Sequence, residues 1–547
     1  MMSFLKSVLH EKELKRFNDA FPDDEGLSYI EQALCYFNVD IAENTQHHIP
    51  KLGRVILVAN HPIGALDALA LLSVVTEARS DVKILGNPLL TSMPPLQPFI
   101  LPYDKNAPQA AQQFSHICQH LKGEGILVVF PASDVPSFNR LRIKDSHWQS
   151  DFLSIAEQSN SPILPAHVSP KKSFLFYSLS IFSKPFSTLL LLRVLLQASL
   201  KQSNNTVNIK IGELIDPLAH EDLSLPLKTK VKLFQKQVYR IGHNKPSLFR
   251  TLTPIAPPED RQRLKHEVEA CEPLGETRDN KKIFLYRSHT DSVLIREIGR
   301  LREEAFRLIG EGTGSERDID DYDQHYMHIV LWDEDDLEVV GAYRLCATHN
   351  EPRLYTSTLF NYNKDTEQII QSGLELGRSF IQPKYWGSRS LEYLWYGIAA
   401  FLRRNPQYRY LLGAVSISNT FSRPAKDLIV GYYQHYYADT EGLTLSSKRP
   451  YTIDDAARQK ISQLFQDKST KEAFTVLKAQ LRHLGYSVPA LYKQYADLTT
   501  QGGTRFLGFN IDPDFNDCVD GLVVVDIKDM STQKRKRYGL MEHEPTT

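Results

Sequence analysis

The sequence predicts an α/β protein made of two successive domains, and three observations support this. Residues 55–215 alternate short apolar runs with helical segments, which is typical of a largely parallel sheet covered by helices. The proline-rich residues 253–260 then interrupt regular structure. After about residue 280 a new strand and helix begin. We therefore expect four parts: an N-terminal helical segment (1–50), a first domain (51–250), a linker (251–280) and a second domain (281–547).

Composition excludes several classes of protein. The chain has 547 residues, too many for one core, and its net charge of −1 creates no overall field that would attract nucleic acid. The five cysteines are far apart and lack Cys-x-x-Cys spacing, which argues against a zinc site or a disulfide framework. Charges interrupt the first few residues, so we see no signal peptide and expect a cytoplasmic location.

The first half is expected to begin with two amphipathic helices and then to alternate strands with helices. The two amphipathic helices are residues 4–18 and 27–42. The strands are residues 55–59, 82–85, 126–130, 162–167 and 207–211, and the helices between them include residues 68–77 and 107–121.

A histidine follows the first of these strands. His61 stands after the apolar run, and Asp67 follows where an apolar helix begins. An imidazole oriented by a carboxylate can take a proton from an attacking hydroxyl. The structural alternative is that His61 caps the strand and that Asp67 is a first-turn carboxylate favoured by the helix dipole.

A second motif favours the catalytic interpretation. The strand at residues 126–130 opens into the small-residue turn Pro131-Ala132-Ser133-Asp134. His-Pro-x-Gly-x-x-Asp, followed by a strand that ends in Phe-Pro-Ala-Ser, resembles the glycerolipid acyltransferase family over about residues 50–215. The resemblance implies transfer of an acyl chain from a thioester to a hydroxyl. It also implies a catalytic pair, His61 and Asp67, and contacts to the acceptor from Gly64, Phe130, Pro131, Ala132 and Ser133.

Two departures from that family restrict the acceptor. Five residues separate His61 from Asp67, whereas the family usually has four. A hemolysin-like branch of the family also has five. The turn lacks the Glu-Gly or the Arg that the family usually carries. We therefore do not expect glycerol phosphate or another phosphorylated acceptor.

Two segments are candidates for contact with a membrane. Residues 174–200 are rich in Leu, Phe and Ile, but Lys184, Pro185 and Arg193 interrupt them, which argues against a spanning helix. Residues 228–250 contain seven Lys or Arg and no acidic residue, which suits anionic lipid or an acidic carrier protein. The structural alternatives are a buried element and a solvated helix face. We expect peripheral contact with the cytoplasmic membrane.

The second half predicts the order of an N-acetyltransferase-like (GNAT) fold. A strand at 283–286 and a helix at 292–309 precede antiparallel strands at 328–332 and 338–345. A third strand at 374–381 leads through a loop into a helix at 391–403. In that fold the loop wraps a pantetheine arm, and free N–H groups at the helix start receive phosphate. Gly387 and Ser388 lie in this loop.

Charged residues recur around these strands. Asp320 and Asp323 precede the first, Arg344 lies in the second, and Glu375 and Arg378 lie in the third. A carboxylate beside Arg can accept a proton from an amine that attacks a thioester. Residues three apart on a strand face opposite sides unless a bulge intervenes. The structural alternative is a network of surface salt bridges.

This pattern resembles the acyl-homoserine-lactone synthases and, more closely, the ornithine-lipid N-acyltransferases, over about residues 283–420. It also includes Arg302-x-x-x-Phe306 in the preceding helix. The resemblance implies Glu375 as the catalytic group. The implied substrate-binding residues are Asp320, Asp323, Arg344 and Arg378, and the implied carrier-binding residues are Arg302, Phe306, Gly387 and Ser388.

Together the two halves resemble the bifunctional ornithine-lipid synthases. This implies N-acylation of ornithine with a 3-hydroxyacyl chain, then O-acylation of lyso-ornithine lipid. Acyl carrier protein would be the donor, and no metal or other cofactor would be needed. The alternatives are glycine or another amino acid as acceptor, a phospholipid acyltransferase, and a membrane-lytic protein of hemolysin type.

Overall fold

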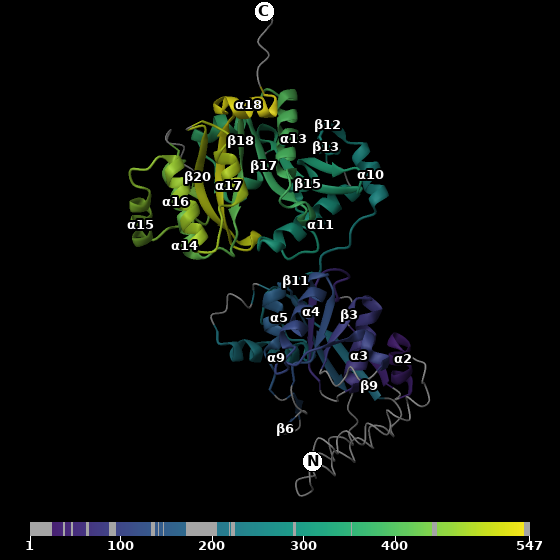
Figure 1. Ribbon diagram of the computed structural model, residues 1–547. Helices are drawn as coiled ribbons and strands as arrows, with labels where there is room; N and C mark the ends of the chain where they lie inside the picture. Colours follow the sequence, from purple (N-terminus) through teal and green to yellow (C-terminus); the bar gives the residue numbers. More distant parts are fainter. Residues whose placement is uncertain are drawn as a thin grey trace, which may run out of the picture. The chain divides into compact units, whose positions relative to one another are not determined.

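The computed structural model divides the chain into two compact units, Met1–Pro254 and Ile255–Thr547 (Figure 1). It describes residues 25–36, 39–44, 48–61, 65–86, 94–132, 137–139, 142–145, 147–170, 205–217, 219, 225–287, 292–351, 353–439, 446–500 and 502–540. The expected helix at 4–18 and the apolar segment at 174–200 lie outside these residues. Within them, no helix is both long and apolar enough to cross a membrane.

The first unit is built on a largely parallel sheet, as predicted. Its strand order is β1-β9-β8-β2-β5-β3-β4. The parallel strands are β2 (Val55–Ala59), β3 (Val82–Gly86), β4 (Ile100–Pro102), β5 (Ile126–Val129) and β8 (Ile163–Pro170). Strand β9 (Asn205–Ile211) pairs with β8 in the antiparallel sense. The short strand β10 (Leu214–Ile215) pairs with the start of β8 and with β11 (Thr251–Leu252).

The central strands β2 and β5 are buried on both faces, which explains why they are entirely apolar. Alternate residues of β2 belong to two separate cores, one containing Leu57 and the other containing Ile56. Residues of α2 (Gly26–Tyr36) and α3 (Ala65–Ala78) share the first core. Residues of α4 (Ala110–Lys122), α5 (Asp151–Ser159) and α9 (Leu227–Gly242) share the second.

One predicted helix is wrong in its second half. The expected helix at 27–42 ends at Tyr36, and β1 (Val39–Asn44) follows it. Strand β1 pairs in parallel with β9, with Val39 opposite Asn205. A strand partner more than 160 residues away therefore overrides the local helical pattern.

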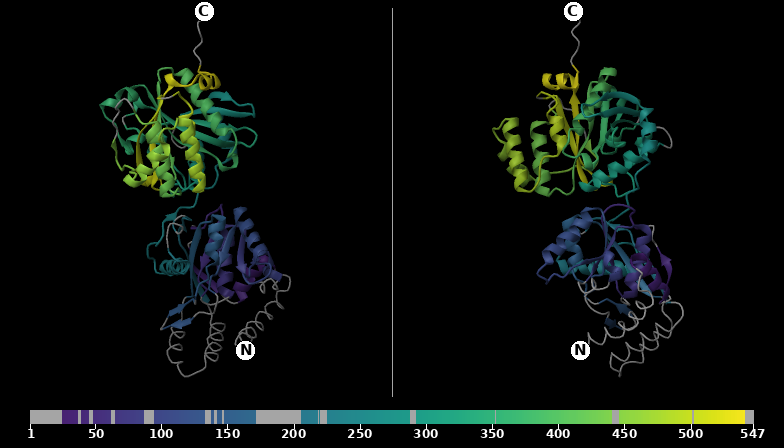
Figure 2. Two further views of the ribbon diagram at one scale, coloured as in Figure 1. Left: turned by 60° about the vertical axis from the view of Figure 1, so that its left-hand side comes forward. Right: turned by 45° about the vertical axis from the view of Figure 1, so that its right-hand side comes forward.

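The second unit contains one mixed sheet in the order β12-β13-β14-β15-β17-β18-β21-β20 (Figures 1 and 2). The expected strands are confirmed as β13 (Lys281–Arg287), β14 (Met327–Asp333), β15 (Glu338–Ala347) and β17 (Gly373–Ile381). The other long strands are β18 (Tyr410–Ile417), β20 (Thr504–Asp512) and β21 (Cys518–Asp526). The expected helices are confirmed as α11 (Val293–Leu308) and α13 (Ser390–Arg404), whose residues belong to different cores.

The expected linker at 251–280 contains elements of the second unit. Helix α10 (Arg261–Glu269) buries Leu264 and Val268 in the core that contains α11, and β12 (Glu272–Glu276) pairs with β13. The Glu267 carboxylate also accepts hydrogen bonds from the first N–H groups of α11, at 2.9 Å from Val293 and 3.1 Å from Leu294. Residues 261–276 are therefore part of the second domain rather than a linker.

This arrangement predicts where the chain can be divided. A fragment of residues 255–547 should fold, because it keeps α10. A fragment of residues 271–547 should lose about 3–5 kcal/mol of unfolding free energy, because two buried aliphatic side chains and a helix cap are removed. Urea unfolding followed by circular dichroism measures the difference, and equal midpoints for the two fragments would contradict the role given to α10.

Candidate active sites

The first candidate site lies where β2 and β5 end. These strands are parallel neighbours, with Val58 opposite Val129, so the residues that follow them meet at one edge of the sheet. The His61 and Phe130 rings lie 4.6 Å apart between centroids. The two sequence motifs of the first domain are therefore in contact.

Two buried polar residues fix the backbone around His61. Asn60 exchanges hydrogen bonds of 2.7 and 2.8 Å with the backbone of Val168 in β8. The Asp145 carboxylate accepts from the His61 backbone N–H at 3.1 Å and from Trp148 Nε1 at 2.9 Å. Asp145 was not predicted as a site residue, because its contact with His61 joins positions 84 residues apart.

The His61 imidazole is held in its neutral form. Burial lowers the pKa of His61 to about 4, so its ring is uncharged at neutral pH, as a base requires. Nearby, Pro131 is buried and Ala132 forms a β-bridge with Trp148. Gly64, Ser133 and the Asp67 side chain lie outside the described part of the chain, so the His–Asp pair stays a prediction.

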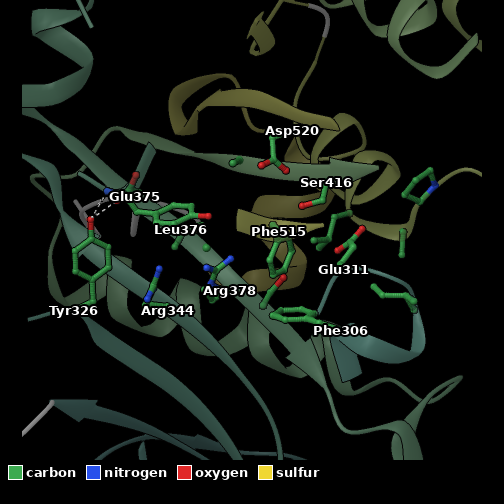
Figure 3. Close-up of a pocket in the computed structure, with 18 residues that line it drawn as sticks. Phe306, Glu311, Tyr326, Arg344, Glu375, Leu376, Arg378, Ser416, Phe515 and Asp520 are labelled. Atoms are coloured by element: carbon green, nitrogen blue, oxygen red, sulfur yellow. Dashed lines mark hydrogen bonds between the residues drawn. The ribbon is translucent and has the colours of Figure 1, made fainter. Parts of the chain in front are cut away.

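The second candidate site is a cavity of about 230 Å³ in the second unit (Figure 3). It lies where β17 and β18 separate, because their pairing is confined to three residues of each strand, Gly373–Glu375 and Tyr410–Leu412. At the next position of β18, a Cβ added to Gly413 would lie 2.1 Å from the Leu376 carbonyl oxygen. The cavity is lined by residues that include Tyr326, Arg344, Tyr355, Glu375, Arg378 and Asp520.

A buried charge network supports one wall of this cavity. The Asp323 carboxylate accepts hydrogen bonds from Arg302 at 2.9 and 2.7 Å and lies 3.2 Å from Arg344 Nη1. Burial opposes its charge, but Arg302 and Arg344 hold the pKa of Asp323 well below its ordinary value. The network is thus interior, and the alternative of surface salt bridges is wrong.

Two residues that were expected to bind the carrier or the substrate are therefore buried inside the protein. Arg302 is 0% exposed and is occupied by Asp318 and Asp323, so it does not contact a separate carrier protein. Asp323 likewise has no free surface to offer a substrate. Asp320 is more accessible and forms a 2.5 Å ion pair with Arg344.

A β-bulge directs Arg378 into the cavity. The register between β15 and β17 shifts between Ala342 and Arg344, and Arg378 has the left-handed φ of +47°. Glu375 and Arg378 therefore line the same cavity although they are three residues apart. The Arg378 guanidinium lies over the rings of Tyr355 and Phe515, at 4.9 and 4.6 Å.

Arg344 lines the cavity together with Arg378, and one of its guanidinium nitrogens forms no hydrogen bond with the described residues. Its guanidinium lies over Tyr326 and Tyr355, 5.3 Å from each ring centroid. Its Nη2 is buried and has no hydrogen-bond partner among the described residues. An anionic group in the cavity would satisfy this donor.

Glu375 is occupied by hydrogen bonds of its own. It accepts from the Tyr326 hydroxyl, from the backbone N–H groups of Tyr355 (3.2 Å) and Thr356 (2.8 Å), and from the Thr356 hydroxyl. A carboxylate has about four lone-pair sites, so few remain for a substrate proton. Glu375 thus fixes the turn η6 (Tyr355–Thr358) and, with it, the Tyr355 ring beside both arginines. The geometry favours this positioning role over the expected role as a base.

Further polar residues that line the cavity were missed, among them Glu311, Ser416 and Asp520. Burial, and then the charge of Asp512, raises the pKa of Asp520 to about 7. Burial, and then the charge of Asp520, raises the pKa of Glu311 to about 8. A sequence signal existed for Asp520, since it interrupts the otherwise apolar strand at 518–525.

The remaining residues expected to contact a carrier are Phe306, Gly387 and Ser388. Phe306 is buried, lines the cavity and packs edge-on against Phe515. Gly387, with a φ of +81°, and Ser388 are exposed just before α13. Their contact with a carrier stays a prediction.

Two families match the chain, one in each unit. Residues 1–246 match the family described as Acyltransferase, and residues 301–396 match the Acetyltransferase (GNAT) domain. The chain therefore joins an acyltransferase domain to a GNAT domain. It is an acyltransferase with an α/β fold.

Three relatives are similar to parts of the chain. The Glycine N(alpha)-acyltransferase of Phocaeicola vulgatus is 28% identical and covers 52% of this chain and 92% of its own length. The Lyso-glycine lipid O-acyltransferase of the same organism is 24% identical and covers 39% of this chain and 78% of its own. The L-ornithine N(alpha)-acyltransferase of Rhodobacter capsulatus is 27% identical and covers 45% and 92%.

The buried network predicts a large effect of Asp323→Asn. Removing this charge leaves Arg302 and Arg344 without their shared buried partner, so the variant should lose about 3–5 kcal/mol of unfolding free energy. Asp321→Asn, on the exposed side of the same turn, is the matched control and should change it by less than about 0.5 kcal/mol. Similar urea midpoints for both variants would contradict the network.

Glu375→Gln tests the positioning role. The amide nitrogen of Gln would face N–H and O–H donors, which leaves at least one buried group unsatisfied at a cost of about 1–3 kcal/mol. Glu367→Gln, at an exposed helix position, should be close to neutral. Chemical unfolding of the three proteins measures this, and full stability in Glu375→Gln would return Glu375 to the list of candidate bases.

Proposed function

We propose that this chain builds a two-chain aminolipid in two acyl transfers. The second unit joins a 3-hydroxyacyl chain, carried as a thioester on acyl carrier protein, to the α-amino group of an amino acid. The first unit then esterifies the 3-hydroxyl of that lyso lipid with a second acyl chain. The first product carries the hydroxyl that the second reaction needs.

One observation carries the amino-acid part of this proposal. Arg344 and Arg378 line a cavity whose volume suits an amino acid, and Arg344 has a buried donor without a partner. Two guanidinium groups match the planar carboxylate of an amino acid better than an uncharged amine. The match to the glycine N-acyltransferase covers more of the chain than the first unit contains, so it includes residues of the second unit.

The ester-forming role of the first unit rests on His61. A buried, neutral imidazole beside the Phe130 turn suits a base that takes a proton from a hydroxyl. The acyltransferase match covers this unit, and one relative is named for O-acylation of a lyso lipid. These observations support O-acylation of a lyso aminolipid.

Two acceptors are supported. The resemblance in sequence favours ornithine, whereas two of the three relatives are named for glycine or for a lyso-glycine lipid. Both amino acids offer the carboxylate and the α-amino group that the cavity requires. Lipid mass spectrometry separates the two, because ornithine adds a side-chain amine.

We also propose that the chain acts at a membrane surface, where its lipid acceptor is found. Lys228, Lys232 and Lys236 lie four residues apart and are exposed on α9. Exposed lysines near an anionic surface contribute about 1 kcal/mol each.

Expression in a bacterium that lacks aminolipids tests the proposal. The wild-type chain should produce lyso and two-chain aminolipids, and His61→Ala should accumulate the lyso form, since only ester formation needs this imidazole. Loss of a general base costs about 10²–10⁴-fold in rate. His116→Ala, on the exposed face of α4, is the matched control and should give wild-type lipids. Absence of any aminolipid from the wild type would overturn the proposed function, and full two-chain product from His61→Ala would overturn the role of His61.

A further inference from the structure

The cavity of the second unit contains two carboxyl groups that the proposed function has not used. Glu311 follows α11 and is 7% exposed, and Asp520 lies in β21 and is 2% exposed. Both line the cavity together with Arg344 and Arg378, and Figure 3 shows all four around the same space. The cavity is therefore lined by cations and by acids.

Neither carboxyl group is neutralised by an ion pair. Glu311 accepts no hydrogen bond from any described residue. Asp520 lies opposite Ser416 in the pairing of β18 with β21, and the Cys518 thiol donates to it at 3.6 Å. Among described residues, Arg378 acts electrostatically on both, but its guanidinium is directed to Asp318, at 3.3 Å, and Asp320, at 3.7 Å.

The carboxyl groups of Glu311 and Asp520 favour a ligand that carries a positive charge. A buried carboxylate without a cationic partner is unstable, and here the cost appears as a pKa of about 7 for Asp520 and about 8 for Glu311. A bound ammonium group would provide the positive charge that the ionised forms of Asp520 and Glu311 lack. Arg344 Nη2 has no hydrogen-bond partner among the described residues, so it favours an anionic group in the same cavity. A lining that favours both an ammonium group and an anion matches a zwitterion.

We propose that Glu311 and Asp520 bind the α-amino group of the acceptor while Arg344 and Arg378 hold its carboxylate, and that Asp520 is the proton acceptor for N-acylation. This inference rests on the proposed function and identifies its base. Asp520 is preferred over Glu375, whose lone pairs are taken by four donors.

The chemical step then balances without a further reagent. The ammonium gives one proton to the Asp520 carboxylate and becomes a neutral amine. The amine nitrogen forms a bond to the thioester carbonyl carbon, and the carbon–sulfur bond breaks. The leaving thiolate takes the second proton from nitrogen, so the products are an amide and a free thiol. Asp520 later releases its proton to solvent.

Asp520→Asn in the full chain tests this inference. The assay uses a 3-hydroxyacyl thioester of acyl carrier protein, with glycine and ornithine offered separately. We expect kcat to fall by about 10²–10⁴-fold, the range for loss of a general base. Glu311→Gln should mainly raise KM for the amino acid, because it removes binding rather than proton transfer.

The fold of the variant can be checked independently. A carboxyl whose folded pKa is raised destabilises the fold as pH rises through about 7, so Asp520→Asn should be at least as stable as wild type at pH 8. The O-acylation of added lyso lipid by the first unit should also be unchanged. Asp526→Asn is the matched control, because Asp526 is buried on the same strand as Asp520 but does not line the cavity.

The outcomes are distinct. A wild-type chain that acylates neither amino acid would refute the proposed function itself. An active wild type with undiminished kcat in Asp520→Asn would overturn the inference alone, as would an equal loss in Asp526→Asn. Loss of N-acylation in Asp520→Asn only, with O-acylation and stability retained, is the expected result.

Discussion

The contact between Asp323 and its two arginines ties the second unit together. Arg302 comes from α11, Asp323 from the turn η4 (Asp321–Gln324) and Arg344 from β15. A helix, a turn and a strand are thus joined through one carboxylate in the interior, where water does not compete. A buried carboxylate is expensive unless it is paired, and Asp323 is paired with both arginines.

The arrangement has a functional consequence because Arg344 is only partly used by it. One edge of its guanidinium is held by Asp320 and Asp323, and the other retains Nη2 without a partner in the described structure. The arginine is therefore fixed in place before any ligand arrives. Binding an anion then costs little ordering of this side chain. Glu375 contributes in the same way, since it holds the turn that carries Tyr355 against both arginines.

The sequence was most informative where a local pattern and the fold agree. Apolar runs buried on both faces identified the parallel strands of the first unit, and the structure shows that the motifs following β2 and β5 meet, with His61 beside Phe130. Prediction from the sequence failed where an element depends on a partner that is distant along the chain. The strand β1 depends on β9, and the capping role of Glu267 depends on the start of α11.

The same distinction applies to the candidate site in the second unit, where membership could be predicted from sequence and roles could not. Residue types in order identified Arg344, Glu375 and Arg378 as members of one site, but their roles depend on burial and on hydrogen-bond counts. Glu375 is saturated, whereas Glu311 and Asp520 are not, and no spacing rule distinguishes them. The bulge at Arg378 was likewise invisible, because it arises from the pairing of β15 with β17.

The close approach at Gly413 has a consequence for how such enzymes diversify. The distance between β17 and β18 at the point where they part is set by main-chain atoms, since even a methyl group at 413 would collide with the Leu376 carbonyl. The side chains that line the cavity do not set this spacing. Substitutions in the lining can therefore alter which acceptor or acyl chain is preferred while the opening between the strands keeps its width. Under the proposed function, selectivity and the geometry of thioester attack can evolve independently.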